Sequence, residues 1–99
     1  MITTKQRAFL RTKANGLDSI FQIGKNGIEE NFLTQVDLAL EKRELIKINV
    51  LESADMSARQ ASDVICEKLG CEGVQAIGRK LVVYRMAKDQ VNRQIELPR

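Results

Sequence analysis

The stretch that decides the fold is Ser19-Ile20-Phe21-Gln22-Ile23-Gly24-Lys25-Asn26-Gly27-Ile28. Its first half, residues 19–23, is short and mainly apolar, which predicts a mostly buried strand. The Gly24-Lys25-Asn26-Gly27 segment that follows predicts a sharp turn, because glycine and asparagine adopt turn conformations that other residues avoid. The residues beyond the turn have helical spacing, so the stretch is a strand–turn–helix unit of an α/β protein.

The helix after the turn is the clearest element of the chain. Apolar side chains recur at helical spacing, at Ile28, Phe32, Val36, Ala39 and Leu40. Glu29 and Glu30 favour the positive N-terminus of this helix, and Lys42 and Arg43 favour its negative C-terminus. A second strand is predicted over residues 45–50, because apolar and polar side chains alternate there.

Working outward from this unit, we expect two more helices. Thr4 is a candidate cap for a helix that runs to about Ala14 and ends at Asn15-Gly16. Ser57 and Gln60 have capping-box spacing and open a third helix that Gly70 closes. The inner stripe of this third helix is predicted to be Ala61, Val64, Ile65 and Leu69.

The C-terminal part predicts a hairpin. Strands are expected over residues 73–77 and 81–85, and the link Gly78-Arg79-Lys80 is short enough to pair them antiparallel. The whole chain, residues 1–99, is then a single α-β-α-β-α-β-β domain with a four-stranded mixed sheet. We expect parallel pairings among the first three strands, which are joined through helices, and one antiparallel pair from the hairpin. Residues 87–99 are predicted to be a loosely packed tail.

The charges are unevenly distributed along the chain. Residues 1–27 carry five basic side chains against Asp18 alone, and residues 73–99 carry six basic side chains against two acidic ones. Residues 28–72 carry five basic and ten acidic side chains. If the two basic ends meet in space they form one positive face, which favours polyanions such as nucleic acid. The alternative is that these are ordinary solvated charges.

The Gly24–Gly27 loop is the candidate binding site. A following helix N-terminus presents unpaired N–H groups and partial positive charge, Lys25 adds a full charge, and Asn26 adds a donor and an acceptor. GXXG loops of this kind clamp RNA in KH modules. A tight turn without a ligand is the alternative. A second copy of the spacing, Gly70–Gly73, runs from a helix to a strand, so it faces the negative helix end and is interpreted as a helix stop.

Other candidate contacts to RNA are basic side chains of the first helix and of the hairpin: Lys5, Arg7, Arg11, Arg79 and Lys80. Lys47 and Arg85 extend the positive face if the sheet presents them beside the loop. Phe21 and Tyr84 are able to stack on bases, but core packing is the favoured role of both.

Several function classes are disfavoured. The chain has no histidine, which is the usual acid–base catalyst near neutral pH, so we expect no catalytic residue. Cys66 and Cys71 are too few for a four-cysteine zinc site or a disulfide framework, so we expect no metal and no cofactor. No apolar run approaches a membrane span or a secretory signal, which predicts a cytoplasmic protein without a membrane partner. A DNA-binding role for the third helix is disfavoured because Arg59 and Lys68 are its only basic side chains.

The chain resembles the stand-alone bacterial form of the CRM (chloroplast RNA splicing and ribosome maturation) domain, the YhbY-type RNA-binding proteins. The residues that carry the resemblance span 4–99: Thr4-Lys5-Gln6 with Leu10 and Ala14, Gln22–Ile28, Glu44–Ile48, Gln75–Arg85 and the Leu97-Pro98-Arg99 ending. Ser19 departs from the pattern, since many members have proline there. The resemblance implies an α/β fold similar to the C-terminal domain of translation initiation factor three. It also implies RNA binding through Gly24, Lys25, Asn26 and Gly27.

The expected function is therefore non-catalytic RNA binding. The bacterial relatives are associated with precursors of the large ribosomal subunit, so the resemblance implies ribosomal RNA as the partner during ribosome assembly. No small-molecule substrate is expected, and nothing in the chain requires more than a monomer. The alternative is an adaptor that contacts proteins of the translation machinery through its acidic helices.

Overall fold

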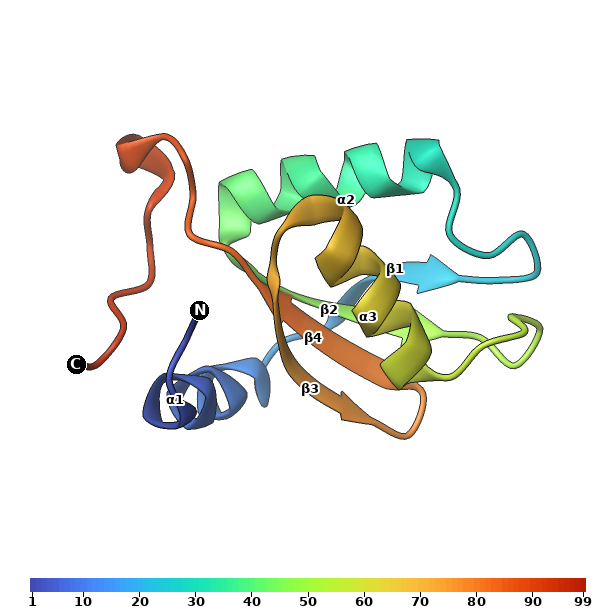
Figure 1. The fold of residues 1–99 in the computed structure, drawn as a ribbon, viewed down its shortest axis with the longest axis horizontal. Coiled ribbons are helices and arrows are strands. Elements are labelled where there is room, and N and C mark those ends of the chain that lie inside the picture. The colour runs from blue at the N-terminus through green and yellow to red at the C-terminus, as the bar shows by residue number, and fades with distance from the viewer.

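The computed structural model describes residues 1–99 and has the predicted order of elements (Figure 1). The elements are α1 (Thr4–Ala14), β1 (Ser19–Ile23), α2 (Glu30–Arg43), β2 (Leu45–Val50), α3 (Ala58–Leu69), β3 (Glu72–Ile77), β4 (Lys80–Tyr84) and a short 3₁₀ turn, η1 (Gln90–Asn92). None of the helices is both long and apolar enough to cross a membrane.

Side-chain caps define where two of the helices begin. The Ser57–Gln60 capping box predicted for α3 is confirmed. For α1, the predicted cap Thr4 is wrong by one residue: Thr3 is the cap, and Gln6 returns a hydrogen bond to its backbone. The same reciprocity between a hydroxyl side chain and a glutamine forms both boxes, and each box satisfies two backbone N–H groups that would otherwise be unpaired.

The four strands form one mixed sheet in the order β1-β2-β4-β3. β1 pairs parallel with β2, while β4 pairs antiparallel with both β2 and β3. The expectation of several parallel pairs is therefore wrong, because β4 lies between β2 and β3. The sequence of β4 explains this place: Leu81, Val82, Val83 and Tyr84 are all buried, which suits a central strand covered on both faces.

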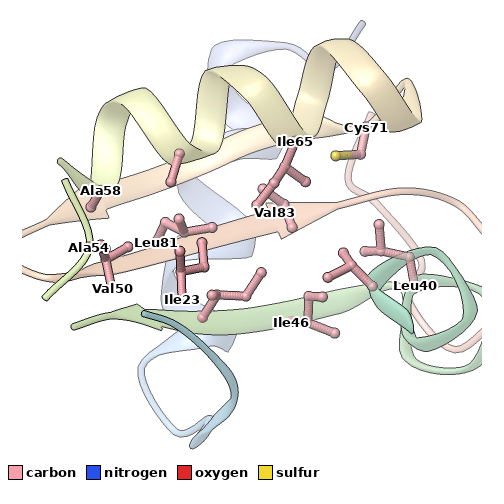
Figure 2. Close-up of a cluster of buried hydrophobic side chains, with 13 residues drawn as sticks. Ile23, Leu40, Ile46, Val50, Ala54, Ala58, Ile65, Cys71, Leu81 and Val83 are labelled. Atoms are coloured by element: carbon pink, nitrogen blue, oxygen red, sulfur yellow. The ribbon is translucent and has the colours of Figure 1, made fainter. Parts of the chain in front are cut away.

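Helices cover the two faces of the sheet unequally. α2 and α3 pack on one face over a large cluster that includes Ile23, Leu40, Ile46, Ile65 and Val83 (Figure 2). α1 packs on the other face over a smaller cluster: Leu10 and Ala14 from the helix meet Leu45, Val74, Val82 and Tyr84 from the strands. This smaller cluster covers only the end of the sheet where β2 begins and β4 ends.

Two predictions of burial need correction. β1 was predicted to be mostly buried, but only Ile23 is, because β1 is an edge strand with no helix over one of its faces. In α3, Val64 is 39% exposed and Ser62 is buried in its place on the inner face. Ser62 fits there because Gly73 of β3 passes close to it without a side chain.

The predicted loose tail is also wrong for residues 87–95, which two carboxylates fasten to the end of α2. Glu44, fully buried, accepts hydrogen bonds from the backbone N–H groups of Ala87, Gln94 and Ile95. Glu41 accepts from the N–H groups of Lys88 and Asp89 and from the Asn92 amide. We call residues 41 and 44 with these partners the carboxylate clasp.

The clasp is expected to open in acid. The Asn92 amide and the backbone N–H groups of Lys88 and Asp89 lower the pKa of Glu41 from 4.5 to about 2. Since the folded-state pKa is depressed, the stabilisation is complete above pH 4.5 and is lost as the pH falls towards 2. NMR amide shifts of Lys88 and Asp89 should titrate in this window. Glu41→Gln should abolish the titration, and an unchanged profile in that variant would contradict the assignment.

Candidate nucleic-acid interface

The Gly24–Gly27 segment is a hydrogen-bonded turn. The Gly27 N–H donates to the Gly24 carbonyl oxygen at 2.9 Å, and Lys25 and Asn26 are exposed at the tip. Gly27 has a φ of +70°, the left-handed region in which residues with a Cβ are strained, so glycine is required at this end of the turn. The turn therefore holds a lysine and an asparagine outward on a defined backbone.

The end of β2 places this turn beside the hairpin. Two consecutive N–H groups there donate in opposite directions: Val50 to the carbonyl oxygen of Arg79 at 2.7 Å, and Leu51 to that of Ile23 at 2.8 Å. The turn after Ile23 and the hairpin at Arg79 thus flank the same strand end. The loop of residues 51–57 lies next to the turn (Figure 1). Its Leu51 and Ser53 side chains adjoin Gly24, and its Met56 side chain adjoins Gly27.

The start of α2 differs from the prediction. The helix begins at Glu30, three residues after Gly27, with Glu29 as a cap residue that makes no side-chain hydrogen bond. Exposed acidic side chains also lie near the turn, at Glu29 and Glu30 and at Glu52 and Asp55 of the neighbouring loop. The side of the turn that faces α2 is therefore mixed in charge. An anion is favoured on the opposite side of the turn, away from these carboxylates.

That other side is the uncovered half of the sheet, which the first helix leaves open. Register places Gln22, Asn49 and Lys80 beside one another across β1, β2 and β4, with Lys47 and Ser19 paired next to them. The Lys80 ammonium donates to the Ser19 hydroxyl across β2 at 3.4 Å. We call these five residues the open half-sheet. It contains two lysines, no carboxylate and several neutral donors and acceptors, a surface that suits a phosphate backbone.

Local sequence patterns named Lys47 and Lys80 as candidate contacts but did not predict the open half-sheet as one surface. The alternation of Lys47 and Asn49 showed that one face of β2 is polar. Whether that face is open depends on where α1 packs, and the pairing of β2 with β4 then brings Lys80 to it. Gln22 is exposed on the same face, and nothing in the local pattern of β1 marks it as a contact residue.

Arg7 and Arg11 lie elsewhere, at the outer edge of β3. The Arg7 Nε donates to the Gly73 carbonyl oxygen at 3.0 Å, and the Arg11 Nε donates to that of Val74 at 3.2 Å. Both line a groove of about 710 Å³ between α1, α3 and β3, which Gln75 also lines and which we call the β3-edge groove. These bonds occupy one nitrogen of each guanidinium and leave the remaining N–H groups for another acceptor.

The other basic candidates are divided by the fold. Arg79 and Lys80 are exposed at the hairpin, at the same end as the turn. Lys5 donates from its ammonium to the Arg99 carbonyl oxygen at 3.1 Å, at the C-terminus of the chain. Arg85 does not extend the positive face: its side chain is 10% exposed and pairs with Asp37 at 3.2 Å and Glu41 at 3.3 Å.

The two aromatic candidates pack against the core clusters: Tyr84 is buried and Phe21 is half-buried. Tyr84 is buried in the cluster beneath α1, and burial and the nearby Glu44 charge raise the pKa of its hydroxyl. Phe21 packs edge-on against Phe32 with ring centres 5.7 Å apart. Stacking of a base on Tyr84 would require exposing the core, and the Phe21 ring is partly covered by Phe32, so a ligand meets a mainly polar and basic surface.

Comparisons with known proteins show which family and which solved structures this chain is similar to. Residues 2–85 match the profile of the CRS1 / YhbY (CRM) domain. YqeI of Bacillus subtilis, named a probable RNA-binding protein, is 42% identical over 98 residues, covering 99% of this chain and 100% of the relative. An RNA-binding protein of Haemophilus influenzae is 35% identical, covering 99% and 96%. The solution structure of a hypothetical protein from Staphylococcus aureus is similar with a TM-score of 0.81 at 45% identity, covering 99% and 100%.

Proposed function

The chain belongs to the CRS1/YhbY (CRM) domain family, and on that premise we propose that it is a non-catalytic RNA-binding protein. Its RNA is proposed to be ribosomal RNA of large-subunit precursors, bound in the cytoplasm during ribosome assembly. The observation that carries the proposal is the meeting of three features at one end of the sheet: the Lys25 turn, the Arg79 hairpin and the open half-sheet.

The proposed contacts are mainly to phosphates. Lys25, Lys47, Arg79 and Lys80 supply four positive charges around the open half-sheet, and its amides and hydroxyl supply hydrogen bonds to sugar and phosphate oxygens. The buried state of Tyr84 and the packing of Phe21 leave little base stacking, so recognition is led by the shape of the RNA backbone. The GxxG turn acts as a clamp at the end of this surface.

The β3-edge groove extends the same surface. Gln75 of the groove and Lys80 of the open half-sheet belong to the paired strands β3 and β4. RNA that leaves the open half-sheet across this edge would meet the free N–H groups of Arg7 and Arg11. Lys5 is proposed as a more peripheral contact, because its ammonium group lies against the C-terminal residue, Arg99.

RNA affinity should fall steeply with salt. Four or five phosphate contacts to single-stranded segments predict a slope of about −3 in a plot of log affinity against log salt concentration. Fluorescence anisotropy with a labelled ribosomal RNA fragment, repeated across a series of salt concentrations, measures this slope. A flat response would contradict a phosphate-led interface.

Sedimentation of a cell lysate tests the proposed partner. At low salt, wild type should travel with large-subunit precursors and be released at high salt, whereas Lys25→Glu should stay at the top of the gradient. If both proteins travel together and resist salt, the partner is a protein surface and the adaptor alternative replaces this proposal. The adaptor alternative has fewer acidic side chains available for a protein partner than the sequence suggests, because Asp37, Glu41 and Glu44 pair with groups of this chain.

A further inference from the structure

The two cysteines face each other at the end of α3. The Cys71 thiol donates a hydrogen bond to the Cys66 sulfur at 3.6 Å. Cys66 is in the last turns of α3, Gly70 ends that helix, and Cys71 comes directly before β3. A disulfide has a sulfur–sulfur distance of about 2.0 Å, so the two sulfurs need to approach by only about 1.6 Å to bond.

The two thiols differ in access. Cys66 is half-buried and is one of the residues that line the β3-edge groove, which gives a small solute a route to this residue. Cys71 is buried behind it, with 7% of its surface exposed. The groove is also lined by Arg7, Arg11, Arg59 and Asp63, so its charge is mixed, and the lowered pKa of Cys66 comes from hydrogen bonds and not from these arginines.

The thiols also differ in their hold on a proton. The hydrogen bond from Cys71 lowers the pKa of Cys66, and the Ser62 hydroxyl at 4.0 Å acts in the same direction. Burial and the negative charges of Glu72 and Asp63 oppose this lowering without reversing it. The same hydrogen bond, together with burial, raises the pKa of Cys71. The proton of the pair therefore stays on Cys71, and Cys66 carries the thiolate character.

We propose that Cys66 and Cys71 form a hydroperoxide-reactive dithiol that closes into an intramolecular disulfide. The Cys66 thiolate attacks the outer oxygen of a hydroperoxide, the O–O bond breaks, and the leaving alkoxide or hydroxide takes a proton. The sulfur of Cys71 then attacks the Cys66 sulfenic acid, the S–O bond breaks, and water leaves with the Cys71 proton. The two sulfurs together lose two electrons, and the peroxide gains them.

The surrounding packing favours closure without a backbone rearrangement. Gly73 passes so close to α3 that a Cβ on it would lie 3.2 Å from the Ser62 hydroxyl and 3.9 Å from the Cys66 sulfur. The start of β3 is therefore already seated against the end of α3, and side-chain rotation can bring the sulfurs together. The bond would close a short loop, so we expect a Tm rise on the order of 5 °C.

Treatment of the reduced full-length protein with hydrogen peroxide tests the dithiol. Intact mass should fall by two hydrogen atoms, both thiols should disappear, and dithiothreitol should restore them. Cys71→Ser should accumulate a sulfenic acid at Cys66 that dimedone traps, and Cys66→Ser should react at least about tenfold more slowly than wild type.

Two results would overturn the proposal. One is oxygen addition to wild-type Cys66 with no loss of the Cys71 thiol. The other is a Cys66→Ser variant that reacts as fast as wild type. The decisive mass change is read on wild type, so it does not depend on how either variant folds. It also does not depend on RNA binding, so it stands or falls separately from the proposed function.

Discussion

Replacing Glu44 by alanine is expected to lower the free energy of unfolding by about 3 kcal/mol. The Glu44 side chain is fully buried and accepts three backbone hydrogen bonds, from Ala87 and Gln94 at 2.7 Å and from Ile95 at 2.9 Å. Alanine would leave these N–H groups without their acceptor beneath the tail. The residue also has a φ of 65°, a strained conformation for a side chain with a Cβ, which alanine would retain.

The charge of Glu44 is part of this effect. Burial acts to raise the pKa of Glu44, but the three backbone N–H groups and the Arg93 charge outweigh it and leave the pKa below 4.5. Glu44→Gln keeps the size of the side chain, but its NH₂ group replaces one acceptor oxygen, so we expect a smaller loss than with alanine.

Urea unfolding of wild type, Glu44→Ala and Glu44→Gln measures the loss, with Glu67→Ala as the control. Glu67 is exposed on α3, so its removal should change the free energy of unfolding by less than about 0.5 kcal/mol. Hydrogen exchange at the Ala87, Gln94 and Ile95 amides shows whether the tail detaches first. A Glu44→Ala protein as stable as the control would mean that the clasp does not hold the tail.

Reversing the charge at Lys25 is expected to weaken RNA binding at least about tenfold near 0.1 M salt, a change of about 1.4 kcal/mol or more. Lys25 is exposed at the tip of a turn whose backbone is set by the Gly27–Gly24 hydrogen bond. The substitution removes one phosphate contact and places a negative charge on the path of the RNA. It should also reduce the magnitude of the salt slope by about 0.7.

Lys68→Glu is the matched control because it makes the same change in net charge. Lys68 is exposed in the last turn of α3. It is the first turn of α3 that follows the loop beside the Gly24–Gly27 turn, so Lys68 lies at the opposite end of the helix. Affinity by anisotropy should change little in this variant. Equal losses in Lys25→Glu and Lys68→Glu would show that net charge, and not the turn, governs binding.

Gly27→Ala gives an independent test of the turn without a change in charge. Alanine at a φ of +70° is strained, and its Cβ would lie 3.6 Å from the Met56 side chain. We expect several-fold weaker RNA binding and a loss of stability of about 1 kcal/mol, which is the cost of holding a residue with a Cβ in the left-handed conformation. Unchanged affinity would indicate that the conformation of the turn does not matter for binding.

Local signals in the sequence were sufficient for the elements themselves. The capping box at Ser57, the helical spacing of residues 28–43 and the alternation of residues 45–50 predicted α3, α2 and β2 within a few residues. The short link at residues 78–80 predicted the β3–β4 hairpin. Such signals depend on neighbours one turn or one pleat away, and these neighbours are adjacent in the chain.

Tertiary structure decided what these elements do together. The insertion of β4 between β2 and β3 brings Lys80 beside Asn49. Because α1 packs only over the other end of this face, Lys47 and Gln22 stay uncovered. The same packing moves Arg7 and Arg11 to the β3 edge, and it turns an apparently loose tail into the partner of Glu44. The sequence by itself determined the elements and the turn, because their energetics are local. Which face stays open and which charges meet depend on contacts between residues distant in the chain, and only the packed fold decides them.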